Sequence, residues 1–141
     1  MKILLAVDGS ACSMRAVAHL VDVLPSLSAA PDLHLLYVHV PLPVGAAQAH
    51  VGHDALQRYY HEESLPHLAD AEKCLEAAGA SFTRHIHVGD AAEVIAHQAG
   101  LLACDWVIMG NQGRSAIADA VLGSVAHRVL RLAPCPVLLV K

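Results

Sequence analysis

The stretch Asp105-Trp-Val-Ile-Met-Gly110-Asn-Gln-Gly113-Arg-Ser115, which runs on to Gly123-Ser124, decides the fold of this chain. Its run from Trp106 to Met109 is short, apolar and β-prone, which indicates a buried strand. The glycines that follow allow positive φ and close backbone approach, and the last of them stands directly before a helical pattern. A strand that leads through a glycine-rich loop to a helix N-terminus presents free N–H groups, so the spacing suggests an anion site.

These glycines can also be read as plain turn residues, and their spacing fits neither of two better-known motifs. The P-loop needs a lysine after its last glycine, but none follows Gly113 or Gly123. The dinucleotide fingerprint G-x-G-x-x-G is absent from the sequence. Both interpretations therefore stay open until the rest of the chain is considered.

The composition of the chain favours one globular domain spanning residues 1–141. The sequence is 55% hydrophobic and 16% charged, which favours strands that are covered on both faces. We expect no membrane association, because no apolar run approaches about 18 residues and the first run stops at Asp8, too early for a signal peptide. A net charge of -4 argues against nucleic acid as a partner.

The cysteines and histidines indicate no metal site. The four cysteines form no C-x-x-C pair, so we expect reduced thiols in a cytoplasmic protein. None of the eleven histidines belongs to an H-E-x-x-H motif, and His85-Ile-His87 is the alternation of one strand face rather than a complete site. We therefore expect no bound structural metal.

Apolar runs alternate with helical patterns along the chain. Pro66 interrupts the second helical pattern, which predicts either a kink or a helix that starts near Ser64. Val44 to Gly52 carries weak signals and is expected to be a loop. The expected strands are Lys2 to Val7, Leu33 to Val40, Ser81 to Val88, Trp106 to Met109 and Val137 to Lys141, and the expected helices are Ala11 to Leu24, Asp54 to Ala78, Ala91 to Leu102 and Ser124 to Leu132.

This alternation predicts a Rossmann-like, doubly wound α/β domain with four helices and a five-stranded parallel sheet in the order 3-2-1-4-5. Ligands of such sheets bind beyond the carboxyl ends of the strands, where the strand order reverses. Those ends are Asp8, Val40, Gly89 and Gly110. We expect Asp8 and Gly110 to face one another across one crevice.

The spacing Gly110-x2-Gly113-x9-Gly123-Ser124 matches the G-x2-G-x9-G-[ST] nucleotide motif of the universal stress protein family, which the chain resembles along its whole length. The sequence is similar to the ATP-binding group of that family. Family members outside this group lack these glycines. Further landmarks that resemble the family are Val7 to Ser10, His39-Val40, Val88 to Asp90, Asp105 to Gly110 and Leu132 to Val140.

For the adenosine half of a nucleotide, the resemblance implies three contacts. Asp8, with the backbone near Ala6, would line the adenosine pocket. The main chain at Val40 would read the edge of the adenine base.

For the phosphate half, the resemblance implies that the glycine loop and the following helix hold ATP, or ADP or AMP, with Mg²⁺. Negative charge at a helix N-terminus is favoured by about 0.3 to 2 kcal/mol, which agrees with a hydroxyl at that place. Gly110 and Gly113 would approach the ribose and phosphates, Arg114 and Ser115 would border them, and Ser124, directly after Gly123, would hold the outer phosphates with the amide of Val125.

Three functions are compatible with these residues: a nucleotide-dependent regulator of a stress response, a slow ATPase, and a nucleotide-independent interaction or chaperone-like scaffold. The resemblance favours the first. We predict no catalytic residue, because no Ser, His and acid arrangement stands out and Asp8 is assigned to adenosine.

The terminal strand, Val137 to Val140, is short and apolar. At a sheet edge such a strand is open to pairing with another copy of the chain. The resemblance implies a homodimer formed through this strand.

Overall fold

A computed structural model of the protein describes residues 1–41, 53–114 and 122–141. The expected loop Val44 to Gly52 and the predicted site residue Ser115 lie outside these residues. The described chain forms one parallel sheet in the order β3-β2-β1-β4-β5, which confirms the predicted order. The strands are β1 (Lys2–Val7), β2 (Asp32–His39), β3 (Phe82–Val88), β4 (Trp106–Gly110) and β5 (Val137–Val140).

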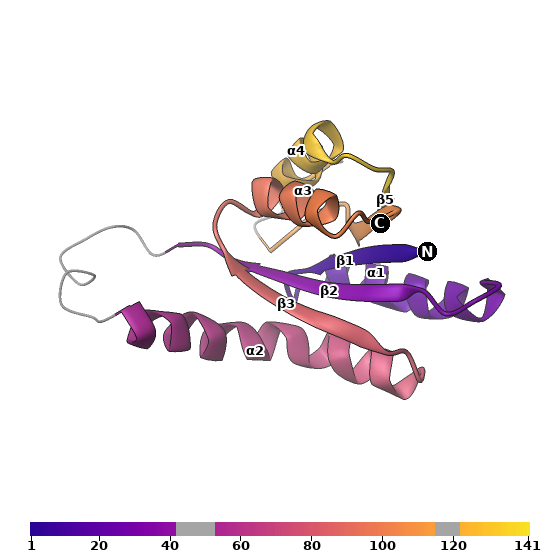
Figure 1. The fold of residues 1–141 in the computed structure, drawn as a ribbon, viewed down its shortest axis with the longest axis horizontal. Coiled ribbons are helices and arrows are strands. Elements are labelled where there is room, and N and C mark those ends of the chain that lie inside the picture. Colours follow the sequence, from indigo (N-terminus) through magenta and orange to yellow (C-terminus); the bar gives the residue numbers. More distant parts are fainter. Residues whose placement is uncertain (42–52, 115–121) are drawn as a thin grey trace.

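Helices cover both faces of the sheet (Figure 1). One face packs against α1 and α2, and the other packs against α3 and α4. This arrangement explains the high apolar content, because the central strands are buried on both sides. The helices are α1 (Ala11–Val23), α2 (His53–Ala77), α3 (Ala91–Leu101) and α4 (Ser124–Leu132), with a short 3₁₀ turn, η1 (Leu24–Ser26), after α1.

Strand β1 is the centre of the molecule. Leu4 and Ala6 point into the core beneath α3 and α4, whereas Leu5 and Val7 point into the core beneath α1 and α2. Its neighbours are β2 on one side and β4 on the other. The chain order reverses between β1 and β4, so the carboxyl ends of these two strands form the place where a ligand is expected.

Helix α2 is continuous through Pro66, so the predicted alternative of a helix that starts near Ser64 is wrong. Proline within a helix costs about 3 kcal/mol, because it removes one backbone hydrogen bond and clashes with the preceding turn. Buried side chains lie on both sides of this position, with Tyr60 before it and Leu68 after it. Packing along the whole helix therefore outweighs the local cost.

Strand β4 is buried except at its start. Trp106, the first residue of this strand, is 43% exposed, whereas the rest of the strand is buried as the sequence indicated. Trp106 stands at the amino end of the sheet beside Ile3, at the opposite end of the strand from Gly110.

None of the helices in the described residues combines the length and hydropathy that a membrane crossing needs.

Candidate functional site

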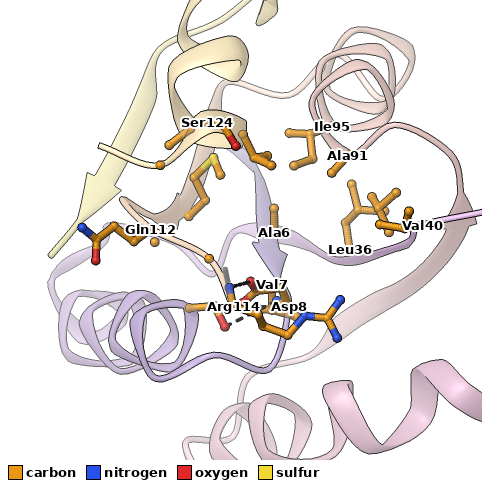
Figure 2. Close-up of a pocket in the computed structure, with 18 of the residues that line it drawn as sticks. Ala6, Val7, Asp8, Leu36, Val40, Ala91, Ile95, Gln112, Arg114 and Ser124 are labelled. Carbon is orange, nitrogen blue, oxygen red and sulfur yellow. Dashed lines mark hydrogen bonds between the residues drawn. The ribbon is translucent and has the colours of Figure 1, made fainter. Parts of the chain in front are cut away.

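A cavity of about 410 Å³ opens at the carboxyl ends of β1, β2 and β4, beside the N-termini of α3 and α4 (Figure 2). The predicted crevice between Asp8 and Gly110 is part of it. Every predicted site residue that the structure describes lines this cavity: Ala6, Asp8, Val40, Gly110, Gly113, Arg114, Gly123, Ser124 and Val125.

The walls of the cavity are mostly apolar, and the sequence did not single out the residues that form them. They come from β2, α3, β4 and the segment before α4, and they give the cavity an apolar lining that suits the face of an aromatic ring. Alternation along β2 could have indicated two of them, because residues two apart share a strand face. These wall residues are Leu36, Val38, Ile95, Met109 and Leu122.

Asp8 joins the loop after β1 to the loop after β4. Its Oδ1 accepts a hydrogen bond from the Ser10 N–H (3.0 Å), and its Oδ2 accepts one from the Arg114 N–H (3.1 Å). Burial acts to raise the pKa of Asp8, but hydrogen bonds from Ser10, Ser13 and Arg114 outweigh it and lower the pKa below 3.8. The cavity therefore carries a fixed carboxylate at neutral pH.

None of the three motif glycines has a positive φ. What requires glycine at these positions is close packing, since an added Cβ would meet a neighbouring atom at each of them. A Cβ at Gly110 would lie 2.9 Å from the backbone carbon of Cys12, and one at Gly123 would lie 3.1 Å from Cα of Gln112. A Cβ at Gly113 would instead meet a side chain, Oδ2 of Asp8, at 2.9 Å. Of the two properties that glycine allows at these positions, the structure uses the close backbone approach and not positive φ.

Helix α4 begins at the cavity without a side-chain cap. Gly123 is its N-cap residue with φ -70 and ψ 152, and glycine has no side chain that could accept a hydrogen bond from the first turn. The Gly123 N–H itself donates to the Asn111 carbonyl oxygen (2.8 Å). Within the described part of the chain, the first-turn N–H groups at Ser124 and Val125 therefore border the cavity without a side-chain acceptor, as an anion site requires.

The guanidinium of Arg114 does not join this helix end. Its Nη1 lies 3.3 Å from Nε2 of His67 on α2, and the His67 ring stacks on Tyr37 with centroids 5.2 Å apart. Figure 2 shows Arg114 and Ser124 on opposite sides of the cavity. In this conformation, Arg114 contributes its backbone N–H to the site and directs its charge toward α2.

An ion-pair cluster ties α4 to α3 beside the cavity. The Arg128 guanidinium donates to Asp90 (2.6 Å) and to Glu93 (3.2 Å). Asp90 also caps α3 by accepting from the Glu93 N–H (3.1 Å). The hydrogen bond from Arg128 lowers the pKa of Asp90, so this carboxylate is charged at neutral pH.

Among the described residues, no histidine lines the cavity. His34, His85 and His87 group on β2 and β3, where burial and the two neighbouring imidazoles lower the pKa of His85. Among the described residues, no group of three or more His, Cys, Asp or Glu side chains is arranged to hold a metal ion.

The family described as the universal stress protein family matches this chain over residues 1–141. Universal stress protein MJ0531 of Methanocaldococcus jannaschii is 29% identical over 140 residues, which cover 99% of this chain and 81% of that protein.

Solved structures show the same fold. The structure of the hypothetical protein MJ0577 aligns with a TM-score of 0.84 and 28% identity, covering 99% of this chain and 94% of that one. A universal stress protein in complex with cAMP aligns with a TM-score of 0.72 and 25% identity, covering 100% of this chain and 97% of that one.

Proposed function

The chain belongs to the universal stress protein family, and we propose that it is an ATP-binding member that acts as a nucleotide-dependent regulator of a stress response. The observation that carries this proposal is the cavity at the reversal of strand order, which brings together an apolar lining, a fixed carboxylate and a helix N-terminus without a side-chain cap. The similar structure that holds cAMP supports an adenine nucleotide as the ligand. We assign this role to one domain, residues 1–141.

The adenosine half of the ligand fits the β2 side of the cavity. The base would lie between the apolar walls, and the backbone of Val40 would meet its polar edge. The Val40 carbonyl oxygen already lies 2.7 Å from Nδ1 of His39, which leaves it a second lone pair for an amino group of the base. The carboxylate of Asp8 would accept hydrogen bonds from the ribose hydroxyls.

The phosphate half fits the start of α4. Backbone N–H groups of Ser124 and Val125, the Ser124 hydroxyl and the helix dipole all favour negative charge there. Gly110 and Gly113 keep the neighbouring wall free of side chains, and Ser115 would follow along the same loop. Mg²⁺ would be bound by the phosphates and water, because Asp8 is the one carboxylate in the described lining.

Turnover has less support than binding. Asp8 is the one group in the described lining with the chemistry of a general base, and both of its oxygens already accept N–H bonds. We therefore propose binding as the principal activity, with slow hydrolysis as an outcome to be measured.

Calorimetric titration of Mg²⁺-ATP into the wild type and the Gly113→Ala variant tests this proposal. We expect saturable 1:1 binding by the wild type and at least about tenfold weaker binding by the variant, because an added methyl displaces the Asp8 carboxylate. Phosphate release over hours in the same sample would reveal an ATPase. If neither protein binds the nucleotide, the result would favour the nucleotide-independent scaffold.

We also propose a homodimer that forms through β5, Val137–Val140, which is an edge strand in the described sheet. Its four residues are only partly buried in the single chain. Pairing with a second copy would cover both the open backbone edge and these apolar side chains.

A further inference from the structure

Two histidines outside the cavity turn their ring nitrogens toward each other. Nδ1 of His34 on β2 lies 3.0 Å from Nε2 of His85 on β3, and the ring centroids are 5.1 Å apart. Both residues stand on the sheet face beneath α3 and α4, because His85 pairs in register with Leu36, two residues after His34. His34 is 7% exposed, whereas His85 is half-buried on the edge strand, so the pair can be reached from one side.

The second nitrogen of His34 has no hydrogen-bond partner among the described residues. Nε2 of His34 is buried and makes no hydrogen bond, and Oδ1 of Asp32 lies 3.6 Å away from it. Leaving a buried polar atom unsatisfied costs about 1 to 3 kcal/mol. This cost suggests that the pair serves a purpose beyond packing.

The geometry suits a metal ion. Imidazole nitrogens bind Zn²⁺ at about 2.0 to 2.1 Å, so two of them at tetrahedral positions lie about 3.3 Å apart. The observed separation of 3.0 Å differs from this by a few tenths of an ångström. A metal at Nδ1 of His34 fixes the ring proton on Nε2, which faces Asp32, and a carboxylate commonly accepts the second N–H of a metal-bound histidine.

We propose that His34 and His85 bind Zn²⁺, or a similar first-row transition-metal dication, with Asp32 orienting His34. Water would complete the coordination, because the described residues offer no third ligand in place. The neighbouring His87 stacks against His85, with centroids 6.3 Å apart and rings inclined by 11°, and does not enter the pair. The site is independent of the proposed nucleotide cavity.

The experiment is a Zn²⁺ titration of the untagged, chelator-treated full chain, followed by calorimetry and by ¹H–¹⁵N spectra of the imidazole rings. The first equivalent of Zn²⁺ is expected to shift Nδ1 of His34 and Nε2 of His85 to metal-bound values. His85→Gln is expected to weaken this binding at least about tenfold, and Asp32→Asn to weaken it by about 10- to 100-fold.

His19→Gln is the matched control, because His19 is an exposed histidine on α1. It is expected to bind Zn²⁺ as the wild type does. His85 is only half-buried, so its variant should fold, which circular dichroism and ATP titration check. If the first equivalent leaves both ring signals unchanged, or if His85→Gln binds Zn²⁺ as tightly as the wild type, the pair is only a hydrogen bond and the proposal fails.

Discussion

At the scale of single residues, Asp8 connects the stability of the fold to the proposed ligand. Its carboxylate holds the backbone N–H groups of Ser10 and Arg114, and so fixes the loops that follow β1 and β4. The same carboxylate lines the cavity. Changes at this position should therefore alter stability and ligand binding together.

The lowered pKa of Asp8 predicts a pH-dependent contribution to stability. A depressed pKa in the folded state stabilises the protein above the ordinary pKa of 3.8, and this gain is lost as the pH falls through the folded-state pKa. Asp8→Asn should lower the free energy of unfolding by about 1 to 2 kcal/mol at pH 7. Urea unfolding of both proteins should show the gap closing below about pH 4. A gap that stays constant down to pH 2 would contradict this account.

The motif glycines should differ in what their substitution damages. At Gly110 a methyl group meets the backbone of Cys12, so Gly110→Ala should destabilise the fold by about 1 to 3 kcal/mol. At Gly113 it meets the Asp8 side chain, so Gly113→Ala should mainly weaken nucleotide binding. Thermal unfolding and ATP titration of the two variants test this contrast, and equal loss of stability in both would oppose it.

At the scale of elements, the start of α4 carries the proposed phosphate contacts. Ser124 is the first residue of the helix, where proline is well tolerated, and Gly123 already has the extended backbone that a following proline requires. This place therefore allows the hydroxyl and the amide to be removed separately without breaking the helix.

Ser124→Ala removes only the hydroxyl, and Ser124→Pro removes the hydroxyl together with the N–H. The alanine variant should bind ATP up to about tenfold more weakly than the wild type, and the proline variant should lose a further 1.5 to 3 kcal/mol or so, typical of a hydrogen bond to a charged group. Both should keep the melting temperature of the wild type. Calorimetry that finds the two variants alike would show that the Ser124 amide does not hold phosphate.

The elements themselves were largely predictable from the sequence. Apolar runs such as that of β1, and helical patterns such as that of α3, indicate the strands and helices directly. Pro66 was ambiguous, because local sequence shows the cost of a helical proline but not the packing on both sides that outweighs it.

The candidate site was predictable where it is built from backbone and motif residues, and less so where it is built from side-chain packing. The cavity walls Leu36 and Val38 look like ordinary core residues in the sequence. The contact of Arg114 with His67 joins positions 47 residues apart, and no local pattern encodes it.

At the scale of the whole molecule, the proposed dimer should depend on the outer edge of β5. The carbonyl oxygens of Pro136 and Val140 accept hydrogen bonds from Val107 and Asn111 next to them, so by alternation the Leu139 N–H points away from β4. Leu139→Pro should therefore block pairing with another copy while it leaves the bonds to β4 in place.

Sedimentation at micromolar concentration should find the wild type as a dimer and Leu139→Pro as a folded monomer. A wild-type monomer under these conditions would contradict the proposed interface.

The central claim is that the cavity at the carboxyl ends of β1, β2 and β4 binds an adenine nucleotide. Backbone amide ¹H–¹⁵N spectra recorded during a titration with Mg²⁺-ATP test it most directly, because they report both binding and its location. We predict saturable shifts concentrated at Asp8, Val40, Gly113, Ser124 and Val125, with little change on the outer strand β3. Absence of shifts at millimolar ATP, ADP, AMP and cyclic AMP, or shifts that avoid these residues, would contradict the claim.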